Sequence, residues 1–539
     1  MSKNVWSLEG GDTITAALAR SVAACPDRTF VNFFDEEYTY LEFDRITNSV
    51  AHGLLDLKVQ GGERVASLLD NHGEVLFSWY GANKIAAVSV AINTAYKGDF
   101  LRHQLADCNA RVLIMESDYV KRLEGIYRQL PDLEYVVFRG EKPEVDIGDI
   151  KLIPFEALRS VDQSPIADPN TPSDVSVFVY TSGTTGQSKG CILSHNNMVD
   201  LAKRVILSDD RREGDVVWTC LPFFHFNAQS TTVVSSTLLN GTAWIAPRFS
   251  VSRFWRDIEQ SEAVVASLLG AMIPLVGQAP DSEEMTRCRG QLRTVAGAPF
   301  PSEMQEVFKQ RFGVQRAGSN IYGLTEASTL TFLPPGVESK PGSAGMPNPD
   351  FDVRIFDDAG NELPAGQSGE VVCRPLKPNI MFQGYHNRPE ATMAMIRDLW
   401  FHSGDIGKID EDGYFYFVDR KKDYLRRRGE NISSYEVETL FQNHPDISEI
   451  AAHAVPSELG EDDLKITVVL EAGARISEEE LCRWCVEKMP YFAVPRYVEF
   501  REELPKNPLG KVEKYKLRDQ GCTATTWDIE KSTITLHKR

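Results

Sequence analysis

The chain has 539 residues, of which 42% are hydrophobic and 25% charged, as expected for a globular protein with roughly three or four domains or subdomains. Asp and Glu number 77 against 58 Lys and Arg, and the formal charge of −19 argues against non-specific binding to nucleic acid or anionic membranes. An anionic ligand must therefore be bound locally, by loop amides or by single cations.

The nine cysteines are scattered and show no zinc-type spacing with histidines. Cys482 and Cys485 form a C-x-x-C inside a helical pattern, which predicts core residues rather than a redox or metal pair. The longest apolar stretch, residues 263–277, is shorter than the ~20 residues of a membrane span and is predicted to be a buried helix and turn. With no signal-peptide, prenylation or peroxisomal pattern, we expect a cytoplasmic protein with reduced cysteines.

Strand-like and helix-like segments alternate in the N-terminal part of the chain. Strands are predicted at 63–70, 87–93 and 110–116, with helices at 74–86 and 99–109 between them. Such alternation predicts a mostly parallel sheet covered by helices on both faces. The same pattern returns between residues 175 and 322.

The pattern changes twice in the C-terminal half. Short β segments and turns fill residues 342–418, with a hairpin predicted at 351–375. A new α/β pattern follows, with helices predicted at 434–445 and 477–489 and a strand at 466–473; these ranges are read from the apolar periodicity. We place a domain boundary near Arg420, which divides the chain into residues 1–420 and 421–539.

The stretch YTSGTTGQSKG, from Tyr180 to Gly190, places glycines and six hydroxyl side chains around a single lysine, directly after the strand-like SVFVY. Glycines let backbone amides approach a phosphate closely, and hydroxyls add donors. The spacing from Gly186 to Lys189 is not that of a Walker A loop, and G-x-G-x-x-G is also absent from this stretch. Taken alone, the loop predicts either a phosphate site of another class or a mobile surface loop.

The loop resembles the signature loop of the adenylate-forming enzymes, which include acyl-CoA synthetases, aryl-CoA ligases, luciferases and the adenylation domains of peptide synthetases. Further segments resemble the family in the same order over nearly the whole chain: LPFFHFN, VAGAPF, NIYGLTE, GEVVCRP, MFQGYHNRPEAT, WFHSGDIG, DRKKDYLRRRGENISSYEVE and LPKNPLGKVEK. Within the family, RRRGENISSYEVE is most similar to the crotonobetaine/carnitine-CoA ligase branch.

This resemblance implies an α/β fold. It consists of a large N-terminal domain of doubly wound αβαβα sheets with a small β-barrel-like part, and a small mobile C-terminal α+β domain. It also implies a two-step reaction, in which a carboxylate attacks the α-phosphate of Mg-ATP and a thiol, usually coenzyme A, then displaces AMP. The implied cofactors and substrates are Mg²⁺, ATP, coenzyme A and a small carboxylic acid. No nucleic-acid partner or transmembrane segment is expected, and a homodimer is left open.

The resemblance assigns the nucleotide site. The β- and γ-phosphates would contact Thr181, Ser182, Gly183, Thr184, Thr185, Gly186 and Lys189. The adenine would lie between Gly297, Ala298 and Pro299 on one side and Asn320, Ile321, Tyr322 and Gly323 on the other. Thr325 would donate to the α-phosphate, Glu326 would bind Mg²⁺, and Asp405 with Arg420 would bind the ribose. From the residues alone, Glu326 could instead be a carboxylate at a helix N-terminus.

The C-terminal segment is implied to alternate between the two half-reactions. Lys511 would bridge the α-phosphate and the attacking carboxylate, although a Gly-Lys in a loop is usually a solvated turn. Lys422 would be the hinge, and the rotation would bring Arg428, Gly429 and Glu430 to the pantetheine arm of coenzyme A. The run 426–428 could instead be a solvated charge cluster flanking a helix.

The acyl pocket is expected between residues 225–230, 268–272, 297–298 and 324–330. Its named residues are His225, Phe226, Asn227, Gly270, Ala271 and Met272. His225 is interpreted as a pocket-lining residue, with proton transfer or simple wall packing as alternatives. The lining does not distinguish a small polar, fatty, aryl or steroid side-chain acid.

Two other functions stay open beside an acid–CoA ligase. One is an adenylating enzyme that loads a carrier protein, and the other is an inactive, ligand-binding homologue. The presence of Lys189, Glu326, Asp405 and Lys511 argues against the inactive homologue. Two positions depart from the family pattern, since Ser403 stands where Thr is common and Asp419 where Gly often precedes the ribose arginine.

Overall fold

The computed structural model describes residues 11–34, 36–181, 187–269, 272–297, 300, 302–420, 424–428, 430–457, 461–506 and 512–536. The chain forms two compact units. The first contains Met1–Asn93, Leu105–Val179 and Gly190–Asp419, and the second contains Thr94–Gln104, Tyr180–Lys189 and Arg420–Arg539. Two short segments from the N-terminal half thus belong to the unit that is otherwise C-terminal.

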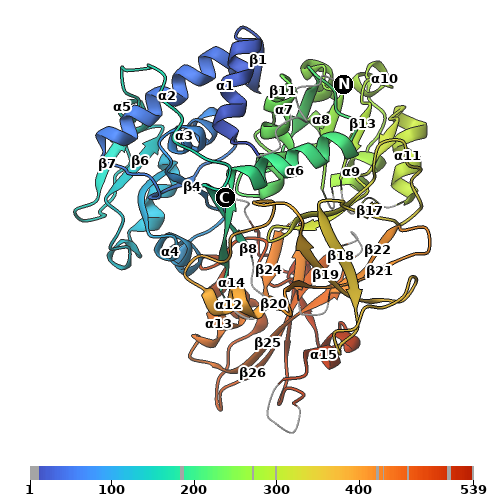
Figure 1. The fold of residues 1–539 in the computed structure, drawn as a ribbon. Coiled ribbons are helices and arrows are strands. Elements are labelled where there is room, and N and C mark those ends of the chain that lie inside the picture. The colour runs from blue at the N-terminus through green and yellow to red at the C-terminus, as the bar shows by residue number, and fades with distance from the viewer. Residues whose placement is uncertain are drawn as a thin grey trace. The chain divides into compact units, whose positions relative to one another are not determined.

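The first of two seven-stranded sheets has the order β7-β6-β5-β3-β4-β8-β9. Its strands β7, β6, β4 and β8 are labelled in Figure 1. The predicted strands are confirmed as β3 (Arg64–Leu68), β4 (Val88–Ala91) and β5 (Ala110–Glu116), which pair in parallel. The predicted crossover helices are α3 (Gly73–Lys84) and α4 (Gly98–Asp107). The sheet is completed by β6 (Tyr135–Arg139), β7 (Lys151–Pro154), β8 (Val175–Thr181) and β9 (Lys189–Ser194).

The second seven-stranded sheet has the order β14-β13-β12-β10-β11-β1-β2. Its strands are β1 (Thr29–Phe33), β2 (Glu36–Thr39), β10 (Val216–Thr219), β11 (Thr242–Ile245), β12 (Val265–Ser267), β13 (Thr294–Ala296) and β14 (Arg316–Ala317). All neighbours pair in parallel except β1 with β2, which are antiparallel.

The prediction of a helix and turn over residues 263–277 is wrong for its first half. Residues Val265–Ser267 form β12 in the interior of the sheet, between β10 and β13, and a helix, α9 (Met272–Gln278), begins only afterwards. A strand buried on both faces is continuously apolar, so its sequence does not differ from that of a buried helix.

The β-rich part of the first unit contains two further sheets. One has three strands, β15 (Ile321–Leu324), β16 (Ser328–Phe332) and β17 (Met346–Pro347). The other has five, β18 (Phe351–Phe356), β19 (Gly369–Pro375), β20 (Ile396–Arg397), β21 (Trp400–Ile409) and β22 (Phe415–Arg420). The hairpin predicted at 351–375 is confirmed by the antiparallel pairing of β18 with β19.

The second unit is built on a mixed four-stranded sheet, β25-β26-β27-β28, and a two-stranded ribbon, β23-β24. The strands are β23 (Tyr424–Arg427), β24 (Glu430–Ser433), β25 (Ile447–Pro456), β26 (Asp462–Leu470), β27 (Tyr497–Phe500) and β28 (Trp527–Asp528). Its predicted helices are α13 (Ser434–Gln442) and α14 (Glu478–Val486), so the α/β pattern after residue 420 is confirmed.

Local capping explains where several helices begin. Thr39 and Glu42 form a capping box at α2 (Tyr40–Asp56), and Ser477 and Glu480 form another at α14, each satisfying amides that have no intrahelical acceptor. The other helices are α1 (Ile14–Ala24), α5 (Phe155–Leu158), α6 (His195–Ser208), α7 (Ser235–Leu238), α8 (Val251–Ser261), α10 (Glu283–Arg287), α11 (Ser302–Phe312), α12 (Pro389–Ala394) and α15 (Lys514–Gln520). A π-helix spans Ala228–Val234, and short 3₁₀ turns span Ser117–Leu123, Tyr127–Gln129 and Ile529–Lys531.

Each unit has its own apolar core. In the second unit, Tyr96 and Phe100 from its N-terminal segment pack with Leu481, Phe492 and neighbouring side chains. Cys482 and Cys485 are fully buried in this core, which confirms them as core residues of α14, and all nine cysteines are free thiols. Over the residues described, we find no helix with both the length and the hydrophobicity of a bilayer span.

Candidate active site

The tight turn between β15 and β16 carries Thr325 and Glu326. Glu326 is buried and accepts a hydrogen bond from the Tyr385 hydroxyl at 2.7 Å. Its backbone carbonyl accepts from the Phe382 amide at 2.9 Å, so the segment around Tyr385 is tied to the turn by two contacts. The alternative placement of Glu326 at a helix N-terminus is wrong, because this carboxylate lies in a β-hairpin.

Tyr322 and Asp405 are joined by a buried hydrogen bond. The Tyr322 hydroxyl, on β15, donates to Asp405 Oδ2, on β21, at 2.9 Å. Burial raises the pKa of Tyr322 well above its usual value, and the neighbouring Asp405 carboxylate raises it further, so the phenol stays protonated as the donor. The Tyr322 ring also packs against Phe415, with 4.8 Å between ring centroids. The structure thus brings the predicted adenine and ribose residues together.

Two glycines of the predicted adenine site have no space for a side chain. A Cβ on Gly323 would lie 2.0 Å from the Ser328 carbonyl oxygen, at a register shift between β15 and β16. A Cβ on Gly297, at the end of β13, would lie 2.6 Å from the Leu268 carbonyl oxygen. Both positions therefore require glycine for close backbone packing.

Ser319 forms hydrogen bonds with both the amide and the carbonyl of Gly297. The Gly297 amide donates to Ser319 Oγ at 3.3 Å, and the Ser319 amide donates to the Gly297 carbonyl at 2.9 Å. The next residue, Asn320, donates its side-chain amide to Ser339 Oγ. The two segments predicted to enclose adenine are thereby joined through Ser319, and Ile321 follows at the start of β15.

Thr181 and Lys189 flank the glycine-rich stretch. Thr181 ends β8 and Lys189 begins β9, and these two strands are neighbours in the first sheet. Within the second unit, the Ser188 amide donates to Glu436 Oε1 at 2.8 Å, and the Ser188 carbonyl lies 2.8 Å from His103 Nε2. Burial raises the pKa of Glu436 to about 7. The lysine end of the stretch is therefore held by polar contacts.

The predicted acyl-pocket residues that the structure describes lie just before the π-helix and at the start of α9. His225 and Phe226 precede it, with His225 partly exposed and Phe226 buried, and Asn227 Oδ1 accepts from Thr231 Oγ1 at 2.6 Å. Met272 begins α9 and contacts Cys220, with 3.9 Å between the sulfur atoms. π-helical turns are often found at functional sites, because they alter which side chains point inward.

The arginine run lies in the β23–β24 hairpin and does not flank a helix. Arg427 is buried; it donates to Asp463 Oδ1 at 3.0 Å and to the Phe492 carbonyl at 3.3 Å. Burial lowers the pKa of Arg427 to about 10. Arg428 is exposed with a positive φ of 56°, and Glu430 begins β24. The solvated-cluster interpretation is therefore wrong for Arg427, whereas the exposure of Arg428 agrees with both interpretations.

Several predicted site residues lie outside the described residues: Ser182, Gly183, Thr184, Thr185, Gly186, Gly270, Ala271, Ala298, Pro299, Lys422, Gly429 and Lys511. Arg420 is described as the last residue of β22, without its side chain. Their roles stay predictions.

Tyr385 and Ser319 were not predicted as site residues from the sequence. Tyr385 lies 59 positions from the Glu326 that it contacts, and Ser319 lies 22 positions from the Gly297 from whose amide it accepts a hydrogen bond. The MFQGYHNRPEAT segment contained Tyr385, but only the tertiary contact identifies its partner.

Two family models match the chain. The AMP-binding enzyme model covers residues 18–386, and the AMP-binding enzyme C-terminal domain model covers residues 436–511. A crotonobetaine/carnitine–CoA ligase of Escherichia coli O157:H7 is 30% identical over 488 residues, which cover 89% of this chain and 93% of that protein. This similarity confirms the resemblance to that branch.

Solved structures agree with the fold. A fatty acyl CoA synthetase of Mycobacterium tuberculosis is 28% identical with a TM-score of 0.66, covering 94% of this chain and 98% of its own. An amide bond synthetase of Marinactinospora thermotolerans has a TM-score of 0.81 at 23% identity, covering 94% and 99%, and supports the fold alone. The chain belongs to the AMP-binding enzymes, the family of AMP-forming acid–CoA ligases.

Proposed function

We propose that this protein activates a carboxylic acid as its acyl-adenylate, releasing pyrophosphate, and then transfers the acyl group to coenzyme A, releasing AMP. The observation that carries the proposal is the β15–β16 hairpin, which holds Tyr322, Thr325 and Glu326 and is joined to Asp405 by a buried hydrogen bond. The resemblance to the family implies that these four residues would bind the nucleotide. Tyr385 orients the Glu326 carboxylate, and Tyr322 orients Asp405.

The residues fit a Mg²⁺ that is bound mainly through the nucleotide. Within the described residues there is no cluster of three or more His, Cys, Asp or Glu side chains that would form a metal site. Mg²⁺ in phosphoryl-transfer enzymes usually takes one or two carboxylates together with substrate phosphates and water. Glu326 supplies a carboxylate of this kind, and the bound ion would neutralise phosphate charge. Thr325 would donate to the α-phosphate.

Lys511 would stabilise the negative charge that develops as the carboxylate attacks the α-phosphate, because a cation placed there acts mainly in the transition state. Asp405 would bind the ribose hydroxyls, and the segment Arg428–Glu430 would guide coenzyme A in the second step. The acyl pocket would be lined by the residues around His225 and Met272.

The test is AMP release from Mg-ATP across short, medium and long fatty acids, aryl acids, carnitine-like acids and steroid acids, with and without coenzyme A. We expect AMP release with one acid class and a higher rate with coenzyme A. Glu326→Gln should reduce that rate by about 100-fold, whereas Glu303→Gln, an exposed carboxylate on α11, should leave it unchanged.

Other outcomes would change the proposal. Pyrophosphate exchange with no response to coenzyme A would favour a carrier-protein acceptor. Failure to form AMP with any acid would favour an inactive homologue.

A further inference from the structure

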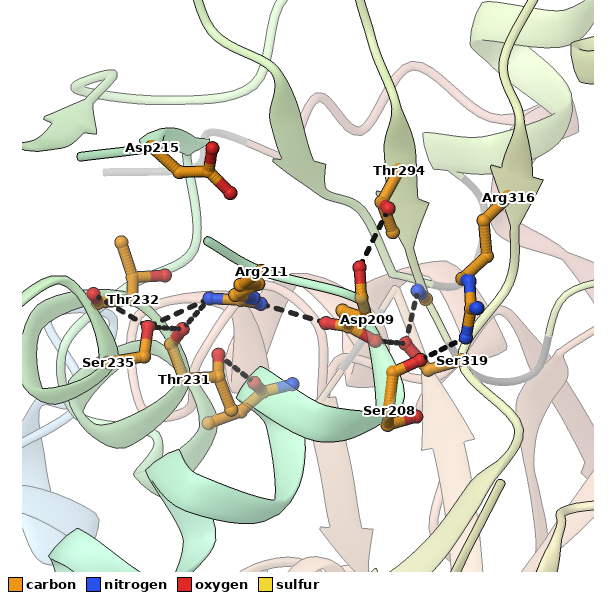
Figure 2. A network of polar contacts seen from close by, with 12 residues as sticks. Ser208, Asp209, Arg211, Asp215, Thr231, Thr232, Ser235, Thr294, Arg316 and Ser319 are labelled. Atoms are coloured by element: carbon orange, nitrogen blue, oxygen red, sulfur yellow. Dashed lines mark hydrogen bonds and ion pairs between the residues drawn. The ribbon is translucent and has the colours of Figure 1, made fainter. Parts of the chain in front are cut away.

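Asp209 and Arg211 form a buried ion pair just after α6 (Figure 2). Arg211 Nη2 lies 2.9 Å from Asp209 Oδ2, and the two side chains are 0% and 1% exposed. Removing two charges from water is unfavourable, and apolar residues of the same volume often stabilise a fold equally well. The hydrogen-bond partners of the pair therefore indicate what it does beyond stabilising the fold.

On the arginine side, the pair holds the π-helix. Arg211 Nη1 donates to the Thr231 carbonyl and to Ser235 Oγ, the latter at 2.8 Å, and Ser235 Oγ donates to the same carbonyl at 2.6 Å. Thr231 Oγ1 in turn donates to Asn227 at 2.6 Å. Arg211 therefore fixes the helical segment that follows His225 and that carries part of the proposed acyl pocket.

On the aspartate side, the pair holds the segment at Gly297 that follows β13. We call this segment the nucleotide turn, because adenine contacts are predicted there. Asp209 Oδ1 accepts from Ser319 Oγ at 3.2 Å, and the Asp209 carbonyl accepts from Thr294 Oγ1 at 2.8 Å. The same Ser319 hydroxyl accepts from the Gly297 amide. Asp209 thus fixes the turn at the end of β13 that would lie against adenine.

We infer that the Asp209–Arg211 pair is a positioning unit that couples the acyl-pocket wall to the nucleotide turn. The inference rests on the proposed function. It means that a change confined to the π-helix side of the pair, such as the loss of the hydrogen bond from Arg211 to Ser235, also alters nucleotide binding. Arg211 is suited to this role because its planar fork reaches Asp209 and Thr231 at the same time, which a lysine ammonium does not do.

The experiment measures AMP binding by calorimetry to the full-length protein and to Arg211→Lys, Asp209→Asn, Ser235→Ala and Ser319→Ala. We expect Arg211→Lys and Asp209→Asn to raise the Kd for AMP at least ~5-fold, the lower end of typical coupling between sites. Ser235→Ala and Ser319→Ala should raise it by smaller factors. In turnover with the acid that best supports AMP release, Arg211→Lys should raise the KM for both ATP and acid.

A matched control is Lys84→Gln. Lys84 on α3 is also buried, and its Nζ lies 2.7 Å from Asp44 Oδ1 on α2, outside the predicted site. This variant should lower the Tm and leave the Kd for AMP unchanged.

If Arg211→Lys lowers only the Tm and keeps the Kd within twofold of wild type, the inference is overturned while the proposed function stands. If Arg211→Lys does not fold, Ser235→Ala is the deciding variant. A raised Kd for AMP supports the inference, and an unchanged Kd overturns it. Wild-type protein that does not bind AMP would overturn the proposed function and the inference together.

Discussion

The buried ion pairs Asp209–Arg211 in the first unit and Lys465–Glu499 in the second have different surroundings. Asp209 and Arg211 contact segments around residues 231, 294 and 319, which are distant in sequence and carry proposed site residues. Lys465 on β26 and Glu499 on β27 lie in one sheet, and Lys465 Nζ also donates to the Gly521 carbonyl at 2.7 Å. One pair therefore joins parts of the proposed site, whereas the other closes a sheet against the C-terminal segment.

Burial of an ion pair therefore does not by itself indicate function. Both pairs are almost completely removed from solvent, so both carry the desolvation penalty of buried charge. What distinguishes them is the identity of the backbone segments that their remaining hydrogen bonds hold.

The largest effect is expected from Lys511→Ala. Losing a cation that acts in the transition state should reduce adenylation about 1,000-fold, while thioester formation from supplied acyl-adenylate should change little. The measurement is the rate of each half-reaction separately. Lys506→Ala is the control, because Lys506 forms an ion pair with Glu449 at 2.6 Å on a partly exposed surface. Equal losses in both half-reactions would contradict the role of Lys511.

The second-largest effect is expected from Glu499→Gln, which should lower the stability of the fold. Replacing the carboxylate leaves Lys465 buried without its counter-charge and should reduce the free energy of unfolding by ~3 kcal/mol, measured by denaturant titration. The exposed pair of Arg483 and Glu479 is the control, since Glu479→Gln should cost less than about 1 kcal/mol. The folded Glu499→Gln protein should bind AMP with the same Kd as the wild type, whereas Arg211→Lys should raise that Kd.

The same pair predicts a dependence of stability on pH. Burial opposes ionisation of Glu499, but hydrogen bonds from Lys465 and Arg501 outweigh it and lower the pKa of Glu499 to about 2. Because the folded pKa is below the unfolded value, this stabilisation is complete above about pH 5 and is lost as the pH falls toward 2. In Glu499→Gln that part of the acid sensitivity should disappear. An unchanged pH profile would show that the pair does not control it.

A smaller effect is expected from Lys422→Pro. Proline fixes φ and should stiffen the proposed hinge, reducing thioester formation about tenfold while sparing adenylation. Single-turnover assays of the two half-reactions measure this directly. An unchanged overall rate would rule out either the rotation or the assignment of the hinge to Lys422.

The smallest effect is expected from Tyr385→Phe in the first unit. Loss of the 2.7 Å hydrogen bond to Glu326 should raise the Mg²⁺ concentration needed for half-maximal adenylation by a few-fold, because groups that orient a metal-binding carboxylate tune its affinity. Tyr416→Phe, whose hydroxyl contacts Asp410 at 3.2 Å away from the candidate site, should have no such effect. If Tyr385→Phe lowers the Tm without changing the Mg²⁺ requirement, Tyr385 contributes to packing and does not orient Glu326.

Local sequence patterns were enough to predict the family and most of the secondary structure. The βα alternation predicted β3, β4 and β5 with their crossover helices, because side-chain periodicity depends on neighbours a few residues apart. The ordered motifs from YTSGTTGQSKG onward predicted an adenylate-forming enzyme. The C-x-x-C of α14 was predicted as core for the same local reason.

The contacts between segments distant in sequence depend on how the whole chain folds. Folding brings Asp209 to Ser319, which is 110 positions away in the sequence. It also brings Tyr385 to Glu326. It also made residues 265–267 a strand and buried Arg427 among backbone carbonyls. Local patterns do not encode these outcomes, because hydrophobicity specifies that a segment is buried but not which segment it is buried against.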